Sequence, residues 1–272
     1  MSQASLPLRH FLLALAVVAV WGTNFVVIRV GLNHLPPLLF ATLRFTLVLL
    51  PMAFFVKRPA VSWANLAAYG VLIGAGQFGL LFVAMKGSIS PGLASLVVQT
   101  QVFFTIGMAM GINREPIRGF QIAALLLAAA SWSGGNIVAR QAGAVNMLAY
   151  VVWASLFSIP PLFLMSLWLE GWPAMVKGVT GADAWTWLAV AWQAVGNTMF
   201  GYAAWGWLLA RHPAATVTPM ALLVPVFGMG ASALLLHEGL PAWKLTAAAL
   251  VLAGLAVNML WPKLRARIWA EA

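Results

Sequence analysis

Long apolar runs that avoid Asp and Glu dominate the chain, and short polar connections separate them. Nine such runs can be counted, over residues 11–30, 38–56, 66–85, 93–112, 120–140, 147–169, 185–210, 215–236 and 245–261. Each is close to the roughly 20 residues that an α-helix needs to cross the hydrocarbon core of a bilayer. Membrane-spanning β-strands would be about half as long and would alternate apolar with polar positions. The pattern therefore predicts an all-α polytopic membrane protein.

The connections are short and carry turn and charge signals, as at Lys57-Arg58-Pro59 and Arg211-His212-Pro213. None of them is long enough to fold independently. The first run continues through Trp21-Gly22-Thr23-Asn24 without a small-residue cleavage site, so we interpret it as a retained helix and not as a secretory signal.

Composition supports the membrane interpretation and removes several kinds of chemistry. Of the 272 residues, 63% are hydrophobic and 7% are charged, against about 25% charged in soluble domains. The chain has no Cys and only four scattered His, so we expect no metal site and no cofactor. The net charge of +10 is divided among short loops, which disfavours nucleic acid as a partner.

An internal repeat is visible by direct comparison. Trp21, Val27 and Arg29 recur as Trp132, Val138 and Arg140, each displaced by 111 positions. Glu115 and Glu238 similarly precede the last helix of each half. Two homologous halves, residues 1–121 and 122–272, are expected, a pattern found in many secondary transporters.

The repeat predicts ten helices, although only nine runs are present. After Glu238 a full run follows, whereas after Glu115 only residues 122–130 precede Trp132. This short stretch cannot supply both the last helix of the first half and the start of the next helix. We infer that a fifth helix is missing near residues 121–131, through disorder or through deletion, and a continuous peptide there would exclude disorder.

The positive-inside rule gives an independent test of this inference. With a cytoplasmic N-terminus and a tenth helix before Trp132, ten basic residues fall on the cytoplasmic side and four outside. With nine helices the tally becomes seven against seven. Ten spans with both termini cytoplasmic are therefore favoured.

Several motifs resemble the drug/metabolite transporter superfamily, and within it the EamA-type exporters. They include Trp21 to Arg29, Leu43-Arg44-Phe45, Pro91 to Gln99, Trp132 to Asn136 and Leu234 to Glu238. The nearest resemblance is to bacterial exporters of cysteine, O-acetylserine and other amino acids, with aromatic amino-acid and viologen exporters further off. The resemblance implies two inverted five-helix repeats around a central cavity in the bacterial inner membrane.

All five acidic residues fall in loops or at the tail, so no membrane-embedded acid is available to carry protons. This favours a facilitator that moves cargo down its own gradient. Coupling through the missing helix or through a loop acid at the cavity mouth is the alternative.

Polar and aromatic side chains inside the runs are the candidates for a cavity. Unpaired amides are costly in a bilayer, so they should face the interior, where they either join helices or contact cargo. The candidates are Asn24, Gln77, Phe78, Gln99, Gln101, Asn136, Trp153, Trp192, Gln193, Asn197, Tyr202 and Trp205. For each Trp, packing against lipid is the alternative.

Some of these candidates remain ambiguous from sequence. Gln99 and Gln101 cannot share one helical face, and we favour Gln99 for the cavity. Asn24 and Asn136 occupy nearly equivalent repeat positions and either flank a pseudo-two-fold axis or bond carbonyls of their own half. Arg44 either binds a substrate carboxylate or, as we favour, snorkels or bonds to carbonyls.

Helix breakers suggest where motion occurs. Pro219 and Pro225 share one run and are our candidates for a gate or hinge, and Pro160-Pro161 interrupt another. Gly70, Gly74, Gly76 and Gly79 crowd a third run, and we interpret them as a surface for close helix packing.

Export of amino acids and related metabolites by alternating access is the function that these patterns favour. Efflux of cationic or aromatic compounds such as viologens is the alternative within transport. A structural bundle or an intramembrane enzyme is a third possibility, but the runs contain no Ser/His pair, paired Asp or zinc motif, so no catalytic residue is assigned.

Overall fold

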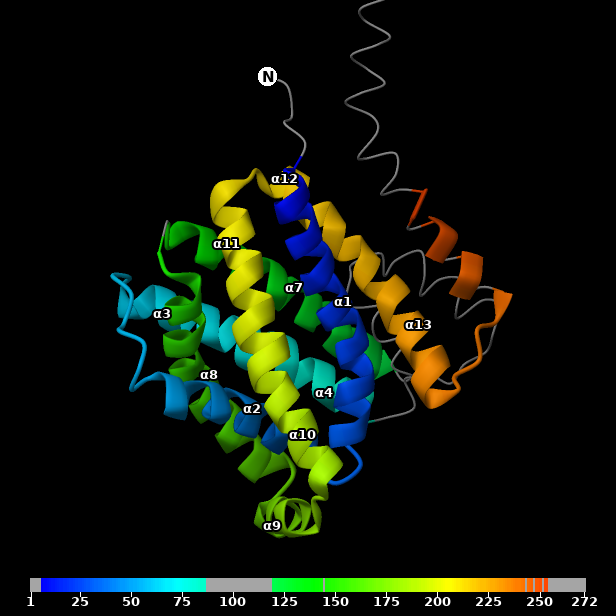
Figure 1. Ribbon diagram of the computed structural model, residues 1–272. Coiled ribbons are helices and arrows are strands. Elements are labelled where there is room, and N and C mark those ends of the chain that lie inside the picture. Colours follow the sequence, from blue (N-terminus) through cyan, green and yellow to red (C-terminus); the bar gives the residue numbers. More distant parts are fainter. Residues whose placement is uncertain are drawn as a thin grey trace, which may run out of the picture.

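The computed structural model describes residues 6–86, 119–143, 145–242, 244–246, 248–250 and 252–253. Within them the chain folds into a bundle of long helices (Figure 1). Four helices are long and apolar enough to cross a membrane, over Leu8–Gly31, Trp63–Met85, Met147–Leu169 and Thr218–Leu236. The runs at residues 93–112 and 245–261 fall largely or wholly outside the described residues.

The first half of the chain contributes α1 (Leu8–Gly31), α2 (Pro37–Met52) and a long helix in three parts. That helix consists of α3 (Trp63–Val71), the π-helical segment η1 (Leu72–Gly79) and α4 (Leu80–Met85). These bounds agree with the predicted runs to within a few residues, except that α2 ends four residues early.

The second half begins with α7 (Gly119–Gln141) and α8 (Met147–Leu169). A second three-part helix follows, made of α10 (Ala184–Trp192), the π-helical segment η2 (Gln193–Tyr202) and α11 (Ala203–Arg211). The short α12 (Ala214–Val217) and the 3-10 segment η3 (Thr218–Leu223) then lead into α13 (Val224–Leu236).

Two expectations about helix continuity are wrong. The helix α7 runs without a break through residues 121–132, so disordered residues do not explain the short stretch after Glu115. Pro160 and Pro161 lie inside α8, which continues past both of them. Pro219 and Pro225, by contrast, stand in the first turns of η3 and α13, where proline fits because those N–H groups have no partner within the helix.

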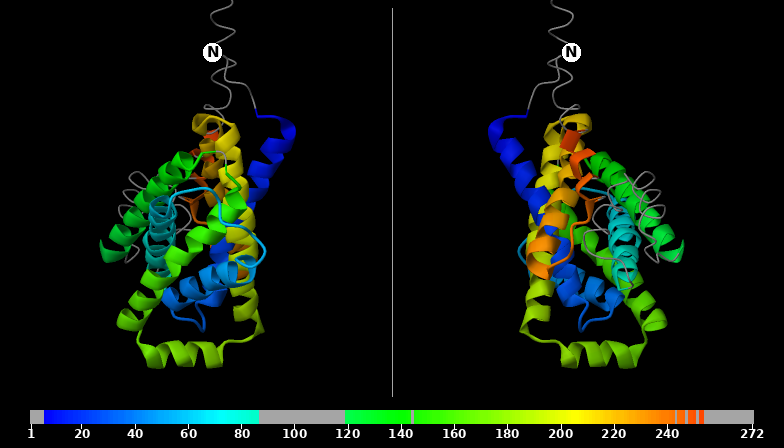
Figure 2. Two further views of the ribbon diagram at one scale, coloured as in Figure 1. Left: turned by 90° about the vertical axis from the view of Figure 1, so that its left-hand side faces the viewer. Right: turned by 90° about the vertical axis from the view of Figure 1, so that its right-hand side faces the viewer.

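We name the two ends of the bundle by α1. The proximal end, where α1 begins, holds His10 beside His212, and the distal end, where α1 stops, holds His34 beside Asp183. A short helix that the sequence did not predict, α9 (Trp172–Gly181), lies across the distal end, roughly at right angles to the long helices (Figure 2). It is amphipathic, burying Met175 and Gly178 while Trp172 is exposed, as expected for a helix at a membrane surface.

Small residues allow the long helices to approach closely. A Cβ at Gly70 would collide with the carbonyl of Ala154 in α8, and one at Gly76 with Ser131 in α7. The glycines at 74 and 79 similarly meet Ser158 and Leu162. The predicted packing role of this glycine series is confirmed, in keeping with small-residue interfaces in membrane helices.

The helix pairings follow the same scheme in the two halves. Residues of α1 lie antiparallel along α10, η2 and α11, with Trp21 against Gly201 and His10 against His212. The helix α7 lies antiparallel along α3, η1 and α4, where Asn65 donates to the carbonyl of Val138. At the centre, α2 packs on α8.

A carboxylate from α8 caps the start of α2. The sequence Pro36-Pro37 offers no side chain that could cap this helix. Glu170 supplies the missing acceptors, with Oε1 2.7 Å from the Leu38 nitrogen and Oε2 3.1 Å from the Leu39 nitrogen. Ser166 donates to the same carboxylate over 2.6 Å. The distal ends of α2 and α8 are therefore joined by hydrogen bonds between helices.

We predict that Glu170→Gln lowers the free energy of unfolding in detergent by about 1–3 kcal/mol, because an amide NH2 then faces a backbone N–H that has lost its acceptor. The measurement is denaturation of the purified protein in mixed micelles. Lys177→Gln, on the exposed face of α9, is the matched control and should unfold like wild type. Equal stability of Glu170→Gln and wild type would exclude the cap as a stabilising contact.

The proximal histidine pair makes stability depend on pH. His10 Nδ1 and His212 Nε2 are 2.7 Å apart, which requires at least one neutral ring. Desolvation, with His10 and Arg211 nearby, lowers the pKa of His212. The native state therefore takes up this proton less readily than the unfolded chain, and the free energy of unfolding falls as the pH drops below about 6.5.

We predict that the melting temperature falls between pH 7.5 and pH 5.5 and that His212→Gln reduces this fall. His237→Asn is the control, since His237 has φ of 53°, which Asn tolerates, and takes no part in the pair. A fall of the same size in His212→Gln and wild type would contradict the assignment.

Candidate functional site

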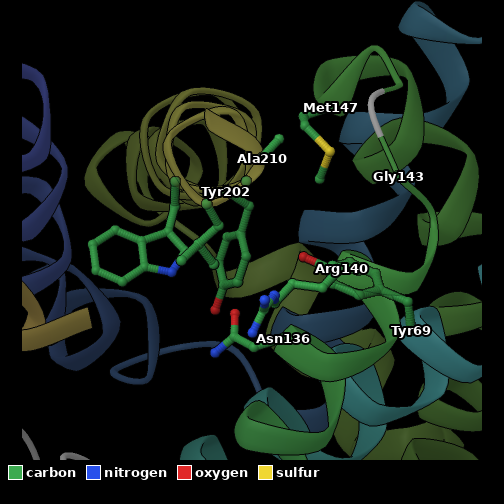
Figure 3. A pocket seen from close by; sticks show the side chains of 11 residues that line it. Tyr69, Asn136, Arg140, Gly143, Met147, Tyr202 and Ala210 are labelled. Carbon is green, nitrogen blue, oxygen red and sulfur yellow. The ribbon is translucent and has the colours of Figure 1, made fainter. Parts of the chain in front are cut away.

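A cavity of about 240 Å³ opens between α7 and the η2–α11 helix towards the proximal end. We call it the proximal pocket. Figure 3 shows Asn136 and Arg140 pointing from α7 towards Tyr202 of η2. Its lining is formed by Tyr69, Asn136, Ala139, Arg140, Gly143, Met147, Tyr202, Trp205, Gly206, Leu209 and Ala210.

A second, smaller cavity of about 40 Å³ lies deeper in the bundle. We call it the inner pocket. It shares Tyr202 with the proximal pocket, and its other lining residues are Trp21, Asn24, Phe25, Ile28, Gln77, Phe78, Leu81, Trp132, Asn197 and Val224. The two pockets together place polar groups of both halves of the chain around one path.

Aromatic rings separate the two pockets. The Trp21 ring lies 5.1 Å from the rings of both Tyr202 and Trp205, and 6.4 Å from that of Trp132. These rings come from α1, α7 and the η2–α11 helix, so the partition is built between different helices. We call these four residues the aromatic partition.

Both π-helical segments meet at the inner pocket. A π-helical turn widens the helix and often marks a functional site. The segment η1 carries Gln77 and Phe78, and η2 carries Gln193, Asn197 and Tyr202. Tyr202 Oη donates to Gln77 Oε1 over 2.9 Å, so the two segments are hydrogen-bonded to each other.

The structure brings most of the predicted cavity residues together. Pocket linings contain Asn24, Gln77, Phe78, Asn136, Asn197, Tyr202 and Trp205. Asn24 and Asn136 line different pockets, so they do not face each other across a single cavity. Gln99 and Gln101 lie outside the described residues. Substrate contact by these residues and a hinge at Pro219 and Pro225 stay predictions.

Two predicted tryptophans are not in either pocket. Trp192 is 43% exposed on the outside of the bundle. Trp153 donates to the carbonyl of Val56 at the proximal end, beside Trp63. Position within an apolar run did not reveal which face of the helix each indole occupies, and packing against lipid stays a prediction for both.

Sequence reasoning missed the other residues that line the proximal pocket, of which Tyr69, Arg140 and Met147 have the largest side chains besides Leu209. The sequence analysis used Arg140 as the repeat equivalent of Arg29 and not as a cavity residue. It supplies positive charge to a pocket whose lining contains no acidic residue among those described.

Arg44 is placed differently from expectation. Its side chain is fully buried and bonds to side chains of η2, not to solvent or backbone carbonyls. Snorkelling is therefore excluded. Phe78, which lines the inner pocket, has its ring centroid 3.5 Å from the Arg44 guanidinium carbon.

Comparison with known proteins places the chain in a family. The sequence model of the EamA-like transporter family matches residues 8–128 and again residues 120–260. A crystal structure with 16% sequence identity has a TM-score of 0.64 and aligns with 93% of this chain and 98% of the other.

Two relatives are named as probable amino-acid metabolite efflux pumps. Those of Salmonella typhimurium and Escherichia coli are 39% and 38% identical, over 91% of this chain and 93% of each relative. Both alignments extend over 279 positions, more than the 272 residues of the whole chain. Each relative thus has residues inside the aligned region that this chain lacks. The chain belongs to the EamA-like transporter family, whose members are multi-pass membrane transporters.

Proposed function

We propose that the protein exports amino acids and related metabolites across the bacterial inner membrane by alternating access, without coupling to protons. The single observation that carries the cargo class is the charge of the proximal pocket. Its described lining combines Arg140 with the Asn136 amide and holds no carboxylate. Such a lining attracts a carboxylate and repels a cation.

The polar groups of the two pockets suit a small zwitterion. The volume of the proximal pocket lies below the roughly 300–1,000 Å³ of drug-sized sites. Two buried polar atoms lack hydrogen-bond partners. Trp205 Nε1 is a donor at the proximal pocket, and Asn24 Oδ1 is an acceptor at the inner pocket. Cationic viologens would find no acidic partner among the described lining residues, so we place them second.

Alternating access is supported by the position of the proximal pocket, which opens towards one end of the bundle. The distal end is tied by the Glu170 cap, by His34 bonded to Thr186 over 2.9 Å and by α9. The proximal pocket lies on the other side of the aromatic partition. We propose that cargo enters there and that movement of α1 against α7 separates Trp21 from Trp132 to admit it to the inner pocket.

Absence of proton coupling is supported by the positions of the described acids. Glu170 and Asp183 lie at the distal end as helix caps, and Glu238 pairs with Lys244 over 2.5 Å beyond α13. None of these three lines either pocket.

We predict saturable uptake of one or more radiolabelled amino acids into proteoliposomes of the full-length protein, with the same rate with and without an imposed pH gradient. Empty liposomes are the control. Uptake only with a gradient would contradict the uncoupled mechanism. If the protein takes up methyl viologen but no amino acid, the cargo class is cationic compounds and not amino acids.

The membrane topology forms a second part of the proposal. The segment 87–118 joins α4 to α7, whose adjoining ends both lie at the distal end, since α7 runs antiparallel along α3, η1 and α4. Its sequence offers a single apolar run at residues 93–112, enough for one crossing and not for the two that a return requires. We propose that the chain has lost one helix of a ten-helix, inverted-repeat fold.

The comparisons support this loss. Residues 120–128 are included in both family matches, as expected where one short stretch replaces the end of one repeat and the start of the next. The extra residues of the relatives within the aligned region also fit it. We propose further that residues 119–253 keep the orientation they would have with the helix present, with both chain termini cytoplasmic.

Because the chain has no Cys, single cysteines can report the topology without background. We predict that Ala60→Cys and Gln141→Cys react with a membrane-impermeant maleimide from the cytoplasmic side, and Thr180→Cys from the outside. The measurement compares intact and permeabilised spheroplasts. If Gln141→Cys and Ala60→Cys instead react from opposite sides, nine crossings have inverted the second half.

A further inference from the structure

Arg44 is the most deeply buried described charge in the bundle. Its side chain has no exposed surface, and it lies in the middle of α2. Nε donates to Thr198 Oγ1 over 2.6 Å, and Nη1 donates to Gln193 Oε1 over 3.0 Å. Nη2 has no hydrogen-bond partner. One face of the guanidinium is covered by the ring of Phe78.

The charge of this guanidinium is not balanced by the described residues. The described acids Glu170, Asp183 and Glu238 have partners elsewhere, and no described ion pair includes Arg44. A buried cation without a counter-ion is costly, more so in a bilayer, and in membrane proteins such groups mark functional sites. Within the part of the chain that the structure describes, no anion balances this charge.

A second unpaired donor belongs to Gln193, the residue that Arg44 Nη1 contacts. Gln193 Oε1 accepts from both Arg44 Nη1 and Asn197 Nδ2, the latter over 3.1 Å, which fixes this atom as the oxygen of the amide. Gln193 Nε2 is then a donor, and it is buried without a partner. Two unpaired donors on hydrogen-bonded side chains are of the kind that the two oxygens of a carboxylate accept from.

The inner pocket borders on residues that contact Arg44 and Gln193. Phe78 and Asn197 line that pocket, and they contact Arg44 and Gln193 respectively. Rotation of the Phe78 ring would open the guanidinium to the pocket. Asn24 Oδ1, an unpaired acceptor in the same lining, is of the kind that an ammonium group needs.

We propose that Arg44 and Gln193 bind the α-carboxylate of the cargo and that Phe78 covers this site when it is empty. The proposal rests on the proposed amino-acid export and specifies its recognition element. Cargo without a carboxylate loses its anchor at this site, so the protein selects acids over the corresponding amides and amines.

The test is a competition assay. It measures uptake of whichever radiolabelled amino acid the wild-type protein transports fastest. Unlabelled amino acid, its α-carboxamide and its decarboxylated amine are compared by half-maximal inhibition in wild-type proteoliposomes. We expect the acid to inhibit at roughly ten- to hundredfold lower concentration than the amide, as loss of a charge-assisted hydrogen bond implies. Equal inhibition by acid and amide in wild type would overturn the proposal without any variant.

Variants separate recognition from folding. In Arg44→Gln we expect the preference for acid over amide to fall to about one, with a partial loss in Gln193→Leu. A purely structural role for Arg44 would lower uptake of acid and amide in the same proportion and leave the preference unchanged. Arg29→Gln, an equal change of charge on an exposed position of α1, is the control and should keep the wild-type preference.

Different results would contradict amino-acid export and the carboxylate site. Wild type that transports no amino acid contradicts the proposed function together with this inference. Wild type that transports an amino acid and its carboxamide equally well contradicts only the carboxylate site.

Discussion

Polar groups inside an apolar bundle must find partners within the bundle, because the bilayer offers none. In this protein one chain of contacts meets part of the requirement and leaves Arg44 Nη2 and Gln193 Nε2 without partners. Arg44 donates to Thr198 and Gln193, and Asn197 donates to the same Gln193 oxygen. The next pair joins the two π-helical segments. Tyr202, about one turn after Thr198 on η2, donates to Gln77 on η1. In the proposed mechanism cargo passes along this chain of contacts, so packing and recognition would use the same residues.

The two π-helical segments explain how so many polar groups gather at one place. A wider helical turn aims consecutive side chains at angles that an α-helix does not provide, and η1 and η2 do so in the third helix of each half. The aromatic partition then divides the interior into an outer, positively charged pocket and an inner one. Cargo would meet Arg140 first and Arg44 last, a progression from an exposed to a fully buried cation.

Most of the fold could be predicted from the sequence because hydrophobic runs report helices directly. The run at residues 147–169 coincides with α8, and that at 120–140 lies within α7. The amides at 24, 77, 136 and 197 were assigned to the interior because an unpaired amide is costly in a bilayer, and all four line a pocket. Trp192 and Trp153 were predicted to line a cavity but line neither pocket. An indole suits both lipid and cavity, so the residue type does not show which way the side chain points.

Other features depend on contacts between distant segments and could not be predicted. Arg44 lies a few turns from the end of its helix, a position from which snorkelling is common, and only the packing of η2 and Phe78 against it shows that it is enclosed. The Glu170 cap joins residues 132 positions apart. Tyr69 comes into the site because α3 lies beside α7, which no local pattern encodes.

If a small zwitterion occupies the proximal pocket, it should protect a single cysteine in the lining from labelling. Ala139→Cys would place the only thiol of the chain in that lining, on a residue with no proposed contact to cargo, and Gln141→Cys would place it on exposed surface of the same helix. We expect a transported amino acid to slow maleimide labelling at 139 and to leave labelling at 141 unchanged. Equal labelling at 139 with and without amino acid, or protection by methyl viologen alone, would contradict occupation of the pocket by a zwitterion.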